Sequence, residues 1–342
     1  MKLLAFGEIM GRMTTHGYER VRQASEYTLY FGGSEANVAV CLAHFGEQTA
    51  FVTKLPDNDL GEVTLRALRA HDVDVSGVVR GKGRLGLYFV EKGAAQRPSK
   101  VIYDRAGSAI ATADPSEFDW ERLLEGCDRL HLTGITPALS DGCAQMCMDA
   151  AKAAKARGIT VSCDINYRSA LWSTQKAGEV LRELMPYVDV AIANEEHMRE
   201  LFDIQPDPSH IDADGELTDE GYASLAARFS EKFDIPVVAM TLRRTITADD
   251  NKIRGMVYMN GGEIAFSRWY QMHMVDRIGG GDAFTAGLLY ALMHDYTPAD
   301  GIEFAVASSA LKHAIESDFN DVTVAEVTAL VNAKHGAGRV QR

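Results

Sequence analysis

Short apolar segments typical of buried strands alternate with segments of helical periodicity along nearly the whole chain. Consecutive parallel strands need a crossover, which is usually a helix, so the alternation predicts a mainly parallel sheet with helices on both faces. The 342 residues, 46% of them hydrophobic, are enough to bury one large core, and we expect a single α/β domain over residues 1–342. The expected strands are 2–9, 50–54, 128–132, 159–164, 188–193 and 237–242; the expected helices are 34–45, 59–70, 140–157, 222–233, 282–293, 298–315 and 324–333.

Three local patterns refine this expectation. Asp59 and Glu62 have the spacing of a capping box, and Gly158 is suited to end the helix 140–157. Segments 18–30 and 85–103 break the alternation, because they are richer in β-forming and aromatic residues. The acidic, proline-containing stretch 205–220 predicts a surface insertion.

Charge and cysteine content limit the class of protein. Lysine and arginine total 35 against 48 acidic residues, a net charge of −13. This argues against a nucleic-acid or anionic-membrane surface, and an anionic substrate would need a local basic pocket. The N-terminus predicts a strand rather than a signal peptide, and no apolar run approaches membrane-spanning length. The five cysteines include no CxxC pair, although Cys143 and Cys147 share a helix face. We therefore expect buried reduced thiols and a cytoplasmic protein.

Three consecutive glycines, Gly279, Gly280 and Gly281, stand directly before Asp282 and an apolar helix. Without Cβ atoms the backbone can approach a ligand closely, and the first helical amides then form an anion site suited to a phosphate. Asp282 at the edge of that site could accept the proton of a hydroxyl in line with the γ-phosphorus. We expect larger residues at 280 or 281 to block the site without unfolding the chain. An ordinary glycine turn with Asp282 as the helix N-cap is the alternative interpretation.

The segment from Asp276 to Asp282 resembles the D-T-x-G-A-G-D signature of the ribokinase-like (PfkB) carbohydrate kinases. A second family signature has a counterpart in GGSEANVAVCLAHFG, residues 32–46, where a glycine pair leads into a helix that carries Asn37. The resemblance covers nearly the full length. It implies a ribokinase-like three-layer αβα sandwich with a mainly parallel central sheet and a small β-sheet lid, contributed by about 12–32 and 84–106.

Two further segments point to the substrate class. Tyr103 and Arg105 alternate in an extended segment, as do Asp164, Asn166 and Arg168 at a strand end, so each set is expected to face one way. Arginine is well shaped to bind a carboxylate with paired hydrogen bonds. These stretches resemble the 2-keto-3-deoxygluconate kinase branch, and the resemblance implies substrate contacts at Gly33, Asn37, Tyr88, Tyr103, Arg105, Asn166 and Arg168. Arg105 as a solvated lid charge and Arg168 as an ion-pair partner of Asp164 remain alternatives.

The nucleotide side matches the family less well. The family's Asn-x-x-Glu is represented by Asn194, but His197 occupies the glutamate position, so the metal ligands stay unknown. Glu195 or Glu196 could substitute through water, and a lone His197 is expected to be a solvated helix residue. Arg243 and Arg244 follow the strand that ends near Thr241, where they could pair with phosphates or with Asp249 and Asp250. The resemblance implies nucleotide contacts at Asn194, Thr241, Arg243, Ala307 and Ser309; for the small residues close helix packing is an equal alternative.

The sequence therefore predicts an enzyme: an ATP- and Mg²⁺-dependent kinase that phosphorylates a sugar acid, foremost 2-keto-3-deoxygluconate to its 6-phosphate, with Asp282 as base. Its expected partners are the sugar acid, ATP and further copies of the chain bound through the lid, without nucleic acid or membrane. A kinase for fructose, ribose or another neutral sugar is the nearest alternative. A nicotinamide-dependent oxidoreductase is disfavoured because the first βα region offers Gly7 and Gly11 rather than GxGxxG, and the glycine triplet lies far toward the C-terminus. The P-loop consensus of Walker-type ATPases is also missing. A catalytically silent sugar-acid sensor on the same fold is disfavoured by Asp282.

Overall fold

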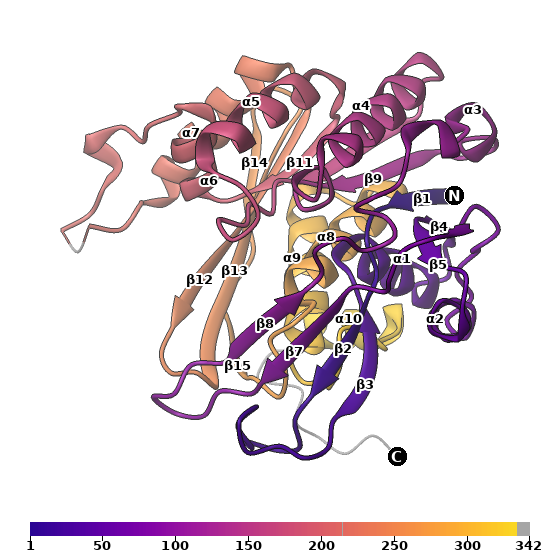
Figure 1. The fold of residues 1–342 in the computed structure, drawn as a ribbon. Coiled ribbons are helices and arrows are strands. Elements are labelled where there is room, and N and C mark those ends of the chain that lie inside the picture. Colours follow the sequence, from indigo (N-terminus) through magenta and orange to yellow (C-terminus); the bar gives the residue numbers. More distant parts are fainter. Residues whose placement is uncertain (214, 334–342) are drawn as a thin grey trace.

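The computed structural model describes residues 1–213 and 215–333, and a nine-stranded sheet forms its centre (Figure 1). Strands β12, β11, β10, β9, β1 and β4 lie side by side in this order and are all parallel. The antiparallel strand β13 extends this sheet beyond β12 and pairs with both β14 and β15. The bounds are β1 Lys2–Phe6, β4 Gln48–Val52, β9 Arg129–Thr133, β10 Thr160–Asp164, β11 Val190–Ala193, β12 Val237–Thr245, β13 Asp250–Met259, β14 Glu263–Phe266 and β15 Tyr270–His273.

Helices cover both faces of the sheet, each over its own apolar core. One core contains Met146, Leu181, Phe202 and Phe229, from α4, α5, α6 and α7 respectively. The other is filled from α1, α2, α8, α9 and α10, and the nearly continuous apolar sequence of α8 is buried on all sides. The predicted three-layer arrangement is confirmed. The bounds are α1 Ser34–His44, α2 Asp59–Arg69, α3 Trp120–Leu123, α4 Asp141–Ala156, α5 Thr174–Leu184, α6 Glu195–Phe202, α7 Asp219–Phe233, α8 Gly280–Met293, α9 Pro298–Lys312 and α10 Val324–Asn332.

A separate four-stranded sheet lies beside the carboxyl ends of β1, β9 and β10, and we call it the lid. Its strand order is β3-β2-β7-β8, with bounds β2 Met10–Thr14, β3 Thr28–Gly32, β7 Leu87–Glu91 and β8 Lys100–Asp104. The small separate sheet implied by the resemblance is thus confirmed, although 18–27 forms turns rather than a strand. The lid strands occupy the lower centre of Figure 1. A further short pair joins β5 Lys54–Pro56 and β6 Val79–Gly81.

Several predicted boundaries were wrong for local reasons. The first strand ends at Phe6, because the chain leaves the central sheet and enters the lid at Met10. Helix α2 is capped by the Asn58 side chain, which accepts from the amides of Leu60 and Gly61, so the proposed box from Asp59 is not formed. Within the described residues no helix is long and apolar enough to cross a membrane. All five cysteines are buried free thiols, as predicted.

Candidate active site

A cleft with a volume of about 440 Å³ lies where the carboxyl ends of the parallel strands meet the lid and the start of α8. Strands β4 and β9 lie on opposite sides of β1, so the crossovers diverge there, and such a switch point is where open α/β sheets bind ligands. The structure brings fourteen of the predicted site residues to this cleft: Gly33, Asn37, Tyr88, Tyr103, Arg105, Asn166, Arg168, Asn194, Thr241, Arg243, Gly279, Gly280, Gly281 and Asp282.

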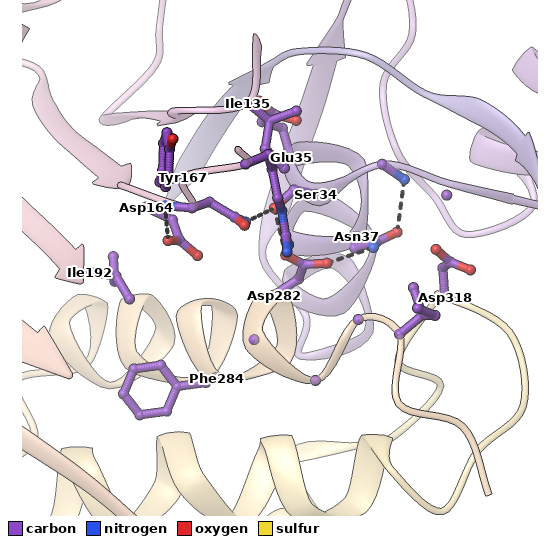
Figure 2. Close-up of a pocket in the computed structure, with 18 of the residues that line it drawn as sticks. Ser34, Glu35, Asn37, Ile135, Asp164, Tyr167, Ile192, Asp282, Phe284 and Asp318 are labelled. Atoms are coloured by element: carbon purple, nitrogen blue, oxygen red, sulfur yellow. Dashed lines mark hydrogen bonds between the residues drawn. The ribbon is translucent and has the colours of Figure 1, made fainter. Parts of the chain in front are cut away.

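The carboxylate of Asp282 is held by two side chains of α1 (Figure 2). The Ser34 hydroxyl donates to Oδ1 at 2.5 Å, and the Asn37 amide donates to Oδ2 at 2.7 Å. Asn166 in turn donates to the Ser34 hydroxyl at 3.2 Å. Burial raises the pKa of Asp282 above its usual value, while these two hydrogen bonds act in the opposite direction. The Asp282 carboxylate is therefore oriented, and burial moves its pKa in the direction that suits a general base.

This arrangement changes two sequence-based assignments. Asn37, expected on the substrate wall, gives its amide group to Asp282. Ser34 was missed, and the only available signal was its position directly after the glycine pair. Asp282 is not the cap of α8, because Gly279 occupies the N-cap position and the Asp282 carboxylate faces α1 instead. The interpretation of an ordinary capped turn is therefore wrong.

The glycine turn, residues 276–281, presents the start of α8 to the cleft. Gly279 has φ of +82°, a left-handed conformation that favours glycine. No side chain caps α8, so its first-turn N–H groups are available to an anion. A Cβ on Gly281 would meet no heavy atom within 4 Å. A Cβ on Gly280 would overlap the buried ring of His313, so a larger residue at 280 requires this ring to shift and is not confined to the cleft.

Two more carboxyl groups lie near Asp282. Glu35 on α1 is 1% exposed, and its Oε1 accepts from the hydroxyls of Thr133 and Thr136 at 2.6 Å each. Burial raises the pKa of Glu35 to about 7 and that of Asp164 to about 7, and the charge on Asp282 contributes in both cases. Glu35 was not predicted, because a glutamate in a helix normally indicates a solvated face.

The two predicted substrate arginines have different surroundings. Arg105 is 9% exposed and forms an ion pair with Glu8, to which its Nε donates at 2.7 Å, so it is not a solvated lid charge. Arg168 is exposed at the cleft, and within the described part of the chain it has no ion pair, with Asp164 or any other carboxylate. Asn166 has φ of +35°, so the extended alternation predicted for this segment stops at Asp164. Asp164, Asn166 and Arg168 nevertheless all line the cleft.

The expected nucleotide side retains an uncompensated cation. Arg243 lines the cleft and forms no ion pair with the described residues. Asp250 pairs instead with His273 at 2.9 Å, and Arg244 stacks over the Trp269 ring at 4.8 Å. The alternative of a local pair between the arginines and these aspartates is therefore wrong.

Asn194 and His197 adjoin this side of the cleft. The Asn194 side chain caps α6 by accepting from the amide of His197 at 2.8 Å. His197 is partly buried and faces the cleft, and burial lowers its pKa to about 4, so it is not the solvated helix residue expected. Glu195 and Glu196 do not line the cleft.

Ala307 and Ser309 do not line the cleft, although the resemblance implied nucleotide contacts there. Both are fully buried where α9 packs against α8. The Ser309 hydroxyl donates to the Gly280 carbonyl at 2.7 Å, so it supports the start of α8 from behind. Small residues here serve close helix packing, which was the alternative left open by the sequence.

Comparisons with known proteins agree with one another. The model of pfkB family carbohydrate kinases matches residues 1–315. The chain is 32% identical over 326 residues to the 2-dehydro-3-deoxygalactonokinase of Haloferax volcanii, with 95% of each chain covered. It is similar to the solved structure of 2-dehydro-3-deoxygluconokinase from Thermotoga maritima, with 41% identity, a TM-score of 0.93 and coverage of 97% of this chain and 100% of that one. A putative 2-keto-3-deoxygluconate kinase from Enterococcus faecalis gives 28% identity and a TM-score of 0.90, with 100% of both chains covered.

Proposed function

The chain belongs to the pfkB family of carbohydrate kinases, and we propose that it is an ATP-dependent sugar-acid kinase that converts 2-keto-3-deoxygluconate to its 6-phosphate. The observation that carries this proposal is the position of Asp282. Its carboxylate is oriented by Ser34 and Asn37 and stands at the N-terminal end of α8, beside the uncapped amides of the glycine turn. A proton acceptor and an anion site side by side are what in-line phosphoryl transfer to a hydroxyl requires.

In this mechanism Asp282 accepts the proton of the terminal hydroxyl as the hydroxyl oxygen attacks the γ-phosphorus. The bond from the γ-phosphorus to the bridging β,γ-oxygen breaks, and ADP leaves with that oxygen. The amides at the start of α8 stabilise the charge that develops on the transferred group. Ser34 and Asn37 keep the carboxylate in one orientation, so it need not reorganise during the reaction. The lid covers the sugar and excludes water that would otherwise hydrolyse ATP.

The sugar acid is supported by the free charge at the cleft. Arg168 is a guanidinium without an ion pair among the described residues, in a chain of net charge −13, so a substrate carboxylate is a suitable partner. Tyr88 and Tyr103, whose ring centroids are 5.8 Å apart, form an adjoining wall. The names of the relatives point to the same class of substrate, and they include both the gluconate and the galactonate epimer.

The nucleotide is expected at the opposite end of the cleft, near Thr241 and Arg243. Among the described residues no group of three histidines, cysteines or acids is placed to hold a metal ion. We propose that Mg²⁺ enters on the phosphates of ATP and keeps most of its waters, which is its usual mode of binding in kinases. Bound in this way, Mg²⁺ would neutralise phosphate charge during transfer.

A neutral-sugar kinase is the second candidate, and one observation favours it. Arg105 already forms an ion pair with Glu8, so of the two predicted substrate arginines Arg168 alone is unpaired and available to a substrate carboxylate. Fructose or ribose hydroxyls could then be bound by Glu8 and Asn166. Incubating the protein with ATP, Mg²⁺ and a panel of sugars and sugar acids, including both epimers, would decide. Mass spectrometry should show the phosphate of 2-keto-3-deoxygluconate as the main product, and a preference for fructose or ribose would refute the sugar-acid assignment.

We also propose a cytoplasmic homo-oligomer that associates through the lid. Leu29 and Ile102 expose 42% and 37% of their surface on lid strands β3 and β8, and apolar residues of this kind suit contact with a second copy. Light scattering of the parent and of a Leu29→Lys variant would test this association. A parent that remains monomeric would refute it.

A further inference from the structure

Arg12 is the largest fully buried side chain of the described residues, and it belongs to lid strand β2. Its guanidinium is 0% exposed and reaches two carboxylates of the main body. Nη1 donates to Asp318 at 2.7 Å, and Nη2 donates to Asp276 at 2.5 Å. The remaining Nε donates to Thr14 of the same strand at 2.8 Å. One buried cation of the lid therefore engages two acids that lie far away in the sequence.

Asp276 and Asp318 flank Gly279, the residue of the glycine turn that has a left-handed backbone conformation. Asp276 begins the turn, and its Oδ1 accepts from the Ile278 amide at 3.1 Å. Asp318 lies on the other side, where its backbone carbonyl is so close that a Cβ on Gly279 would overlap it. In Figure 2 Asp318 lies to the right of Asp282, past Asn37, and both aspartates line the cleft. Movement of either carboxylate would therefore shift the amides that we assign to phosphate binding.

A second link joins the lid to the same acid. The hydroxyl of Tyr88, on lid strand β7, donates to Oδ2 of Asp318. Tyr88 also lines the cleft and stacks with Tyr103, so it belongs to the wall that would contact the sugar. Gly32 of β3 packs closely against the same carboxylate, because a Cβ there would overlap it. Each oxygen of Asp318 thus accepts from a different lid strand.

The buried charges of this group balance. Lys312 is 0% exposed, lies close to Gly279 and donates to the Ile315 carbonyl at 3.1 Å. Burial lowers the pKa of Lys312, and the charges of Asp276 and Asp318 oppose that effect. Two cations thus accompany two anions, and the group keeps its geometry only while every member is present.

We propose that Arg12, through Asp276 and Asp318, is a positioning residue that couples the sugar-covering lid to the phosphate-binding turn. A sugar acid that orders the lid against Tyr88 would then also hold Asp318 and the glycine turn in place for the nucleotide. By linkage, each ligand should tighten the binding of the other. This inference rests on the proposed function, since it requires both a sugar acid and a nucleotide in the cleft.

Calorimetric titration of the full chain would test the coupling. The measured quantity is the Kd of a nonhydrolysable ATP analogue with and without saturating 2-keto-3-deoxygluconate, together with the Kd of the sugar acid alone. Arg12→Lys keeps the positive charge but replaces the planar guanidinium by one ammonium group, which cannot reproduce the separate contacts that Nη1, Nη2 and Nε make with Asp318, Asp276 and Thr14. Tyr88→Phe removes only the hydroxyl that donates to Asp318. Arg97→Gln is the matched control, because it removes another lid guanidinium, paired with Glu91 at 2.7 Å, that does not contact this group.

We expect the sugar acid to tighten nucleotide binding about tenfold in the parent and in Arg97→Gln, and less than about threefold in Arg12→Lys and Tyr88→Phe. A purely structural role would lower the melting temperature and leave this ratio unchanged, which would overturn the inference. So would a parent that binds both ligands without coupling. Should Arg12→Lys fail to fold, Tyr88→Phe decides alone. A parent that binds nucleotide but no sugar acid would instead refute the proposed substrate, and the titration would be repeated with the sugar that the product panel identifies.

Discussion

The same substitution at two neighbouring glycines should have opposite consequences. In Gly281→Ala the new methyl group points into open space at the cleft, where no protein atom lies within 4 Å. In Gly280→Ala it points into the ring of His313, which is fully buried and held through Nδ1 by the Ser309 carbonyl at 2.6 Å. The first change should therefore affect phosphate approach, and the second should affect folding.

The expected magnitudes follow from these contacts. Alanine is favoured over glycine in a helix by up to about 1 kcal/mol, so Gly281→Ala should be as stable as the parent or slightly more stable. Its kcat should fall by about 10² to 10³, the usual effect of losing one donor to a developing negative charge. Gly280→Ala should lose about 1 to 3 kcal/mol of unfolding free energy through overpacking. The residual activity of its folded fraction should exceed that of Gly281→Ala.

Urea unfolding and steady-state kinetics on the purified variants would measure both quantities. The double variant His313→Ala with Gly280→Ala is the control. Without the ring, the added methyl group should destabilise the fold less than it does in Gly280→Ala alone. A Gly281→Ala variant with the kcat of the parent would show that this backbone does not approach the phosphate. A Gly280→Ala variant of unchanged stability would show that His313 moves aside readily.

Three other outcomes are expected. Asp282→Asn should lower kcat by about two to four orders of magnitude with nearly unchanged nucleotide affinity, because it removes the base and keeps its shape; equal activity would exclude Asp282 as the base. Arg168→Ala should lower kcat/KM for the sugar acid by a factor that corresponds to about 1.5 to 3 kcal/mol, and it should affect a neutral ketose much less. Arg105→Ala should also destabilise the fold, because it leaves Glu8 buried without its partner. Equal losses for both substrate types in Arg168→Ala would contradict the carboxylate contact. The pKa of Glu35 is about 7 in the folded protein and 4.5 in the unfolded chain, so between these values only the folded protein holds the proton. The stabilisation that this proton provides is complete below pH 4.5. It falls by roughly 3 kcal/mol as the pH rises from 4.5 through 7. Glu35→Gln should flatten that part of the pH profile in denaturant titrations, and an unchanged slope would show that another group titrates there.

Local sequence patterns made much of this protein predictable. The alternation of apolar strands and helices was sufficient to predict a mainly parallel sheet covered on both faces, because strand and helix periodicities are local properties. The glycines before Asp282 were sufficient to place a close backbone approach at the start of α8, and this turn does line the cleft. Of the predicted site residues that meet at the cleft, Asn166, Arg168 and Asn194 do so because they follow parallel strands whose carboxyl ends share an edge, whereas the others come from α1, the lid, β12 and the start of α8.

Tertiary contacts decided what each of these residues does. Whether Arg105 is free or paired depends on Glu8, 97 positions away, and the hydrogen bond of the Asn37 amide depends on Asp282, 245 positions away. Arg12 gave no signal in the sequence, because an arginine in a strand normally indicates a solvated edge. Its burial against Asp276 and Asp318 arises only when the lid folds back on the main body. Local pattern therefore determined the fold and the position of the site, while long-range packing assigned the charges their partners.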